Sequence, residues 1–321
     1  MPPSGPVVAF VRQSGAAPAS VWLANAGGGR ARLLGPGGAP LVSPNGALVA
    51  AGQAIGGRQI LLYDATGGSR VTVTMPRATV DDPIAWSPDS RYLGVQMVST
   101  ATRGLGHAGL AVIDTTTDRF TVVARGTVAG ASFAGDDSVV YGLTRSTNPL
   151  GAVNLHRSSQ TGIGSSQLTH DGRSLNPVWT TKGILFDRER MRGRDAAPAY
   201  QVWLLRGAHA RRLTQMRIPP LQDGLVPLDA SADGNRILAE FEGEDTSYAW
   251  TIQLRPLRVS QVRVGRRQAQ GGAISRAGDR LLVFTGALER PADHGTILSL
   301  PFAGRGAVHT IGRGALPSWD L

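Results

Sequence analysis

The segment from Asp187 to Asp195 carries the residues best suited to bind a ligand. Its sequence, Asp-Arg-Glu-Arg-Met-Arg-Gly-Arg-Asp, places Arg188, Arg190, Arg192 and Arg194 two residues apart. A guanidinium group can hold a carboxylate or a phosphate through two parallel hydrogen bonds. The acids in the same segment allow a second interpretation, in which the loop pairs with itself and is solvated. The segment therefore predicts either an anion contact or a self-paired surface loop.

Other residues that could do chemistry are dispersed. The six histidines show no His-Glu-x-x-His pair or other zinc spacing. His170-Asp171 and Asp293-His294 could converge with residues of other repeats on a metal or a general base, but a lone loop histidine is more often simply exposed. Residues 240–245 contain four acids without the spaced ligands of a calcium loop. We therefore expect no metal and no cofactor.

Nucleophile signatures are absent from the sequence as well. The chain has no Gly-x-Ser-x-Gly elbow and no Walker loop. It also contains no cysteine, which excludes thiolate catalysis, disulfides and Cys-based zinc. No catalytic residue can be named from the sequence.

A short sequence motif recurs about every 46 residues. This indicates a repeating framework that positions the polar residues. The clearest copies of the motif are Pro83–Ser90 and Asn176–Gly183. A period of this length is typical of a β-propeller with one four-stranded blade per repeat. Seven equivalent positions, which we call the anchors, predict seven blades: Val42, Trp86, Phe133, Trp179, Ala230, Ile274 and Trp319.

Each repeat has the pattern of four strands. A tight-turn sequence follows the anchor, as in Ser87-Pro88-Asp89-Ser90, where Pro presets φ and Asp favours turns. An apolar strand such as 92–95 comes next, and its nearly continuous apolar character predicts burial on both faces. Third and fourth strands, such as 201–205 and 211–214, complete the repeat. This leaves almost no room for helix.

The two ends of the chain supply parts of one blade. Residues 315–321 provide an anchor strand, and 7–34 read as second, third and fourth strands without a first. Pairing of these N- and C-terminal strands would close the ring and remove exposed strand edges. We therefore predict an all-β, seven-bladed β-propeller that forms a single domain over residues 1–321. We expect Trp86, Trp179 and Trp319 to pack between adjacent blades.

Several repeats resemble those of the TolB-like propeller family. The resemblance rests on Ser166–Gly172 followed by Asn176–Trp179, on Pro83–Asp89, and on Arg211–Thr214. In that family a Leu-Thr ending and a polar loop precede Pro-x-Trp-Ser-Pro-Asp-Gly. The resemblance implies fold more specifically than function, because such repeats occur in a periplasmic accessory protein, in bacterial lipoproteins and in peptidases.

The resemblance also implies where function lies. In such blades the fourth-to-first and second-to-third connections emerge on one face, around the central channel, which we call the channel-mouth face. Short hairpin tips form the opposite face. We therefore expect ligand or partner contacts at residues of the channel-mouth face, namely Asp81, Asp82, His107, His170, Arg188, Arg190, Arg192, Arg194 and His294.

The chain is strongly basic, with a formal net charge of +10 and Lys182 as its one lysine. A basic surface attracts nucleic acid, anionic lipid or acidic proteins. However, abundant Ala, Gly, Arg and Pro are typical of a GC-rich bacterial genome in which Arg replaces Lys, and no basic run alternates with aromatic residues as in a base-stacking platform. We expect a protein partner, keep an acidic or carbohydrate ligand open, and do not expect nucleic acid.

The sequence gives little information on location. No apolar stretch approaches the roughly 20 residues of a membrane-spanning helix, and residues 1–6 do not resemble a signal peptide. As written, the chain is expected to be a soluble, unexported monomer. An extracytoplasmic location stays open if the start is trimmed or misassigned.

Two classes of function remain. The missing catalytic signatures favour a non-enzymatic interaction module, in which a rigid ring presents loops to a partner. The alternative is a propeller-type hydrolase or lyase whose polar residues come from several blades and leave no linear motif. An enzyme of this kind would show converging polar side chains with perturbed pKa values in the channel mouth.

Overall fold

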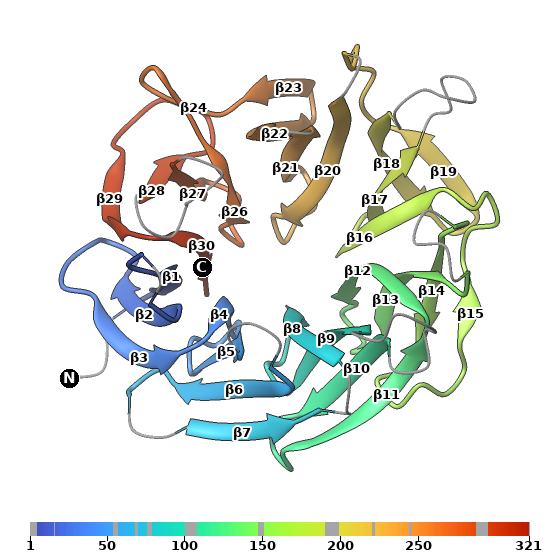
Figure 1. Cartoon of the computed structure of the whole chain (residues 1–321). Coiled ribbons are helices and arrows are strands. Elements are labelled where there is room, and N and C mark those ends of the chain that lie inside the picture. Colours follow the sequence, from blue (N-terminus) through green and yellow to red (C-terminus); the bar gives the residue numbers. More distant parts are fainter. Residues whose placement is uncertain are drawn as a thin grey trace.

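The computed structural model is all-β, and none of the residues it describes is helical. It describes residues 5–15, 17–53, 57–67, 70–75, 79–99, 108–146, 151–189, 199–219, 222–243, 246–286 and 295–320. Figure 1 shows the sheets standing around a central opening, like the blades of a propeller. Most sheets have four antiparallel strands, as the four apolar segments in each repeat predicted.

Most sheets are built from consecutive segments of chain, so most strand pairs are local hairpins. One sheet contains β4 (Gly38–Val42), β5 (Leu48–Gly52), β6 (Gln59–Asp64) and β7 (Arg70–Thr74). The next contains β8 (Thr79–Trp86), β9 (Tyr92–Ser99), β10 (Gly109–Asp114) and β11 (Arg119–Arg125). A third contains β12 (Thr127–Phe133), β13 (Val139–Thr144), β14 (Asn154–Ser158) and β15 (Ser166–Gln167). A fourth contains β26 (Gln270–Ile274), β27 (Arg280–Thr285), β28 (Thr296–Pro301) and β29 (His309–Arg313).

One sheet is larger, with eight strands. Its first four are β16 (Ser174–Thr180), β17 (Gly183–Glu189), β18 (Tyr200–Arg206) and β19 (His209–Arg212). The other four are β20 (Gln222–Ala230), β21 (Arg236–Gly243), β22 (Thr246–Leu254) and β23 (Leu257–Gln261). A single parallel pair, Tyr200 with Gly224, joins the two antiparallel groups. A short ribbon of β24 (Arg263–Val264) and β25 (Arg267–Gln268) follows.

The two ends of the chain share one sheet. The strand β30 (Ala315–Trp319) is antiparallel to β1 (Val7–Arg12), and β2 (Ser20–Asn25) and β3 (Arg32–Pro36) complete the sheet. Beside this pair, the Val7 amide donates a hydrogen bond to Asp320 Oδ1 at 2.8 Å.

The anchors have a common structural role. Three of their amides donate hydrogen bonds of 2.9–3.0 Å to a side chain of the neighbouring blade: Val42 to Ser318 Oγ, Trp179 to Ser132 Oγ, and Ile274 to Asp229 Oδ2. Each acceptor directly precedes another anchor in the sequence. The repeat therefore preserves a contact that fixes one inner strand against the next.

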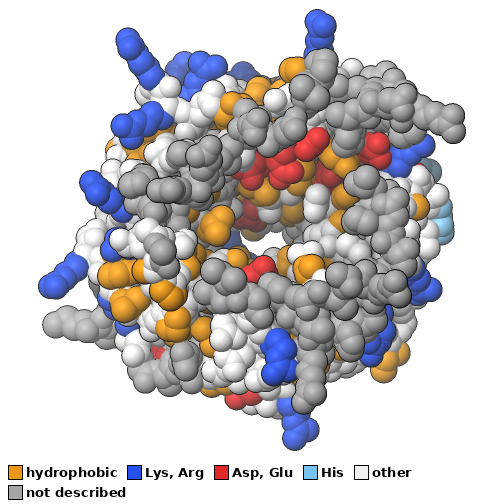
Figure 2. All heavy atoms as spheres, viewed as in Figure 1, with side chains coloured by type: hydrophobic (Ala, Val, Ile, Leu, Met, Phe, Trp, Pro, Cys, Tyr) orange, Lys and Arg blue, Asp and Glu red, His pale blue; other side chains and the backbone are white. Residues whose placement is uncertain are grey.

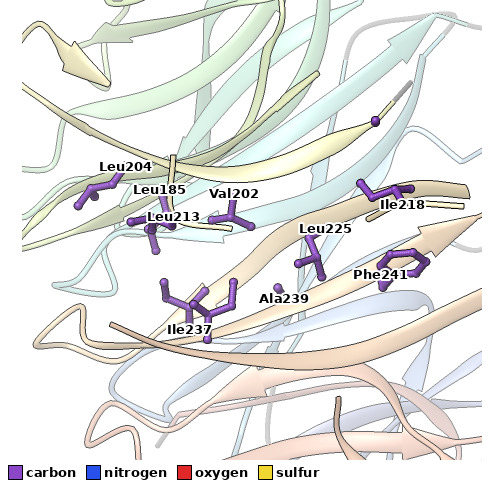
Figure 3. Close-up of a cluster of buried hydrophobic side chains, with 11 residues drawn as sticks. Leu185, Val202, Leu204, Leu213, Ile218, Leu225, Ile237, Ala239 and Phe241 are labelled. Carbon is purple, nitrogen blue, oxygen red and sulfur yellow. The ribbon is translucent and has the colours of Figure 1, made fainter. Parts of the chain in front are cut away.

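The core lies between the faces of neighbouring blades. Figure 3 shows one such cluster, in which Leu185 and Val202 of β17 and β18 lie with Leu225 and Ile237 of β20 and β21. The next residue of β17, Phe186, is buried in a different cluster on the other face of the strand. Because alternate side chains of a strand point to opposite faces, burial on both sides accounts for the continuous apolar run.

Trp86 and Trp319 pack between adjacent blades, as predicted. Trp319 is 6% exposed, and Trp86 is half-buried. The Trp86 ring packs against a cluster drawn from the β4–β7 and β8–β11 sheets, and its Nε1 donates to the Leu41 carbonyl at 3.2 Å. Trp179 is also half-buried.

We expect Trp86→Ala to lower the free energy of unfolding by about 3 kcal/mol, at the low end for such truncations because the ring is only half-buried. Urea titration of both proteins measures the difference. Leu33→Ala, at a side chain that is 56% exposed, is the control and should change little. A loss below about 1 kcal/mol for Trp86→Ala would contradict its packing role.

Candidate functional site

The structure describes three side chains of the nine expected contact residues: Asp82, His170 and Arg188. For Asp81 it describes only the backbone, within β8. The remaining five, His107, Arg190, Arg192, Arg194 and His294, lie outside the described residues. Among the hydrogen bonds and ion pairs of the described residues, none joins Asp82, His170 and Arg188 to one another.

Arg188 is held by its own neighbours. Its guanidinium forms an ion pair of 2.6 Å with Asp171 and lies 4.5 Å from the ring centre of Trp203 and 5.0 Å from that of Phe186. Burial lowers the pKa of Arg188, and the charge of Asp171 opposes that shift. The segment that looked like a loop also begins as strand, since β17 continues to Glu189. These contacts are those of a self-paired arginine.

His170 and Asp82 are both exposed. The Nδ1 atom of His170 lies 3.1 Å from Gln167 Nε2. Asp82 lies opposite Gln96 in the β8–β9 pair, and desolvation raises its pKa. An exposed carboxyl group can still be desolvated where protein surrounds it at the wall of a channel, because little bulk water lies near it.

The structure brings together five acids that are not among the nine predicted residues. We call Asp187, Glu189, Asp223, Glu240 and Glu242 the acid cluster. Each affects the pKa of another member or of Tyr200, which lies among them. Figure 2 shows acidic side chains gathered on one side of the central opening, over β17, β18, β20 and β21 as seen in Figure 1.

A row of backbone pairs explains this proximity. Glu189 lies opposite Tyr200, Tyr200 pairs with Gly224, and Gly224 lies opposite Glu242. Gly224 has φ +119°, and a Cβ atom there would lie 2.4 Å from the Tyr200 carbonyl oxygen. Only glycine allows this approach without strain. The row crosses from one blade to the next and sets their acidic strand ends side by side.

Asp187 has the least contact with water. It is 1% exposed, and neither carboxyl oxygen has a hydrogen-bond partner among the described residues. Burial raises the pKa of Asp187 to about 7, and the nearby charge of Glu242 adds to the shift. The Asn176 side chain and the backbone amide of Asp187 lie close enough to reduce the shift, but neither reaches hydrogen-bond geometry with the carboxyl oxygens. A buried carboxyl group left in this state is costly.

The other members repel one another. Burial, followed by the charges of Glu240 and Asp223, raises the pKa of Glu242 to about 7. Burial and four surrounding acids raise the pKa of the Tyr200 phenol to about 12. In the described part of the chain, Glu240 is the one member whose carboxyl group accepts hydrogen bonds, from Ser247 Oγ and from the Gly271 amide. The ion pairs of the described residues involve none of the five acids, so the cluster resists further negative charge.

Asp229 is a buried acid with a structural role, and its hydrogen bonding differs from that of Asp187. Desolvation raises its pKa to about 6. Its Oδ1 accepts the Ala230 amide at 2.8 Å and its Oδ2 accepts the Ile274 amide at 2.9 Å. Both oxygens are satisfied, in contrast to those of Asp187.

Within the described ranges, no three His, Asp or Glu side chains are arranged to hold a metal ion. In the same part of the chain, no helix has the length and apolar character needed to cross a membrane.

No protein-family model and no curated protein sequence matches the chain. Its fold matches solved structures. TolB from Acinetobacter baumannii aligns with a TM-score of 0.55 and 15% identity, over all of this chain and 88% of that one. An oligogalacturonate lyase in complex with manganese aligns with a TM-score of 0.63 and 11% identity, over 88% of this chain and 82% of that one.

A structure from an analysis of two prolyl endopeptidases aligns with a TM-score of 0.61 and 12% identity, over 97% of this chain. The chain spans 50% of the length of that protein. At these identities the comparisons concern fold alone. They confirm the prediction of a β-propeller that resembles TolB.

Proposed function

We propose that this protein is a non-enzymatic interaction scaffold that binds a protein partner through its channel-mouth face. The observation that carries the proposal is the acid cluster, which lies toward the channel-mouth ends of β17, β20 and β21 and whose members form no ion pairs with the described residues. Unpaired charge held on a rigid scaffold destabilises the free protein and is useful when a partner of opposite charge covers it. The fold itself does not distinguish binding from catalysis, because a lyase and an endopeptidase are among its structural neighbours.

We also propose that the fold is a single domain of seven blades, closed through β30. Five sheets have four strands, and the eight-stranded sheet divides into two groups of four at the Tyr200–Gly224 pair. The inner strand β30 contacts both β4 and β26. These contacts support a continuous ring of inner strands.

The nine residues predicted from the sequence remain proposed contacts on the same face. Reversing the charges of Arg190, Arg192 and Arg194 is predicted to weaken binding of a partner that presents acidic groups to this segment as well as basic groups to the acid cluster. Stability should change by no more than about 0.5 kcal/mol, the usual range for surface substitutions.

Site-directed cross-linking tests the proposed face, and the absence of cysteine makes it direct. We expect a photo-reactive maleimide at Val98→Cys or His170→Cys, on the channel-mouth face, to capture one and the same protein from cells of the source organism. The label at Arg276→Cys or Arg305→Cys, exposed positions on the opposite face, is the matched control. Capture from the control positions alone would contradict the proposal.

One observation favours a hydrolase or lyase as a second candidate. Asp187 and Glu242 both have a pKa of about 7, which suits proton transfer at neutral pH. An enzyme would turn over a member of an oligosaccharide or peptide panel, and Glu242→Gln would reduce that turnover about 100-fold or more. The scaffold predicts no turnover of any member.

A further inference from the structure

We propose that the acid cluster binds a cationic group of the partner, an ammonium or a guanidinium, and that Asp187 is the carboxylate with which this cation pairs. The inference rests on the proposed function, because it assumes that the partner approaches the channel-mouth face. Beyond the proposed function, the inference specifies the charge of the bound group and the residue that binds it.

The direction of the Asp187 side chain places its carboxyl group between its own blade and the next. Side chains alternate along a strand, so Asp187 lies on the same face of β17 as Leu185. Leu185 packs with Leu225 and Ile237 of the next blade, between the two blades drawn in Figure 3. Asp187 therefore points toward β20 and β21. Glu240 and Glu242 lie on the other face of β21, and Glu242 is close enough for its charge to raise the pKa of Asp187.

The two Asp187 oxygens lack hydrogen-bond donors. An ionised carboxylate can accept about four hydrogen bonds, yet neither oxygen accepts one from the described residues. The contrast with Asp229, whose two oxygens accept backbone amides, shows that packing in this fold can satisfy a buried acid. The open positions at Asp187 match a group rich in N–H donors, such as guanidinium or ammonium.

The surroundings select a cation over other ligands. Among the described residues, Glu189 lies on the same face of β17 as Asp187, and Tyr200 on β18 and Glu242 on β21 interact electrostatically with Asp187. Asp223 on β20 acts on both Tyr200 and Glu242. Arg188 lies on the other face of β17, paired with Asp171. An anion would meet repulsion from every one of these acids, and the described side chains do not form a metal-binding group.

The members of the acid cluster differ in their exposure to solvent. Glu189, Asp223 and Glu242 are half-buried, whereas Asp187 is nearly inaccessible. In the proposed complex, the half-buried acids contact the stem of a long cationic side chain such as Lys or Arg, and its charged end pairs with Asp187.

Binding of an acetylated tri-arginine amide, measured by calorimetry, tests the inference. At pH 8 we expect wild-type protein to bind this peptide and Asp187→Asn to bind it at least about tenfold more weakly, because a buried charge pair loses one partner. Asp118→Asn makes the same charge change at an exposed turn on the opposite face and should stay within about twofold. Binding of an acetylated tri-glutamate amide, which would involve the arginine segment, should be the same for wild type and Asp187→Asn.

Proton linkage gives a readout that a merely structural role would not produce. Asp187 and Glu242 are mostly ionised at pH 8 and mostly protonated at pH 6. Wild-type affinity should therefore fall about tenfold or more between these values, and titrations in two buffers should reveal proton release on binding. Asp187→Asn should lose much of this dependence, although Glu242 continues to titrate.

Equal affinity of wild type and Asp187→Asn, absence of wild-type binding, or affinity that does not change with pH would each overturn the cation site. Cross-linking distinguishes failure of the cation site from failure of the scaffold proposal. A partner captured equally by wild type and Asp187→Asn at the channel-mouth positions would leave the scaffold intact and refute the cation site. Capture only at the opposite face, with peptide binding still dependent on Asp187, would refute the scaffold proposal instead.

Discussion

Asp187→Asn is expected to stabilise the folded protein at pH 8 by about 2–4 kcal/mol. Burial raises the pKa of Asp187 to about 7, about three units above that of an unfolded aspartate, and each unit corresponds to about 1.4 kcal/mol. The lower figure allows for the new amide, which also needs hydrogen-bond partners. The substitution would then exchange the cation binding proposed above for stability, a trade-off that is common at functional sites.

The pH dependence has a definite sign. Below about pH 4 the carboxyl group is protonated in both states, so it does not destabilise the fold. Between about pH 4 and pH 7 the unfolded chain releases the proton while the folded protein retains it, and the stability of wild type falls as pH rises. Above pH 7 the full cost is present.

Urea titrations of wild type and Asp187→Asn at pH 4, 6 and 8 measure this effect. The advantage of the variant should be near zero at pH 4 and largest at pH 8. Asp118→Asn, at an exposed site, should show no comparable trend. A variant that is less stable than wild type at pH 8, or a difference that is the same at every pH, would show that Asp187 is satisfied in the folded protein.

Deletion of residues 315–321 is expected to destabilise the protein by more than about 5 kcal/mol. It removes β30, the hydrogen-bond partner of β1, together with Ser318, which accepts the Val42 amide. Loss of the buried Trp319 ring alone should cost about 3–5 kcal/mol. The backbone groups of β1 left without partners add about 1–3 kcal/mol for each one that stays buried.

Graded variants separate loss of the strand from a general effect of mutation. Trp319→Ala should lower stability by about 3–5 kcal/mol, whereas Leu316→Ala, at a side chain 51% exposed in the same strand, should stay within about 0.5 kcal/mol. A synthetic peptide of residues 315–321, added in excess, should raise the melting temperature of the truncated protein. An unchanged melting temperature after the deletion would refute closure through β30.

The all-β architecture could be predicted from the residues alone, because the signals for a blade are local. Ser87-Pro88-Asp89-Ser90 was predicted to be a tight turn, and in the structure Ser87 Oγ donates to Asp89 while the Ser90 amide donates to the Ser87 carbonyl. Apolar residues 92–95 then form β9. The turn residues and the apolar strand residues lie within a few positions of one another in the sequence, and the same pattern recurs in each repeat.

The acid cluster forms only through contacts between blades. Asp187 reads in the sequence as the first residue of a charged loop, but it lies within β17 and is covered by the next blade. Glu242, whose charge acts on Asp187, and Asp223 belong to a different repeat, and the Tyr200–Gly224 pair brings the two repeats together. A raised pKa depends on burial and on charges brought close by folding. Both depend on contacts between blades, which no local run of residues specifies.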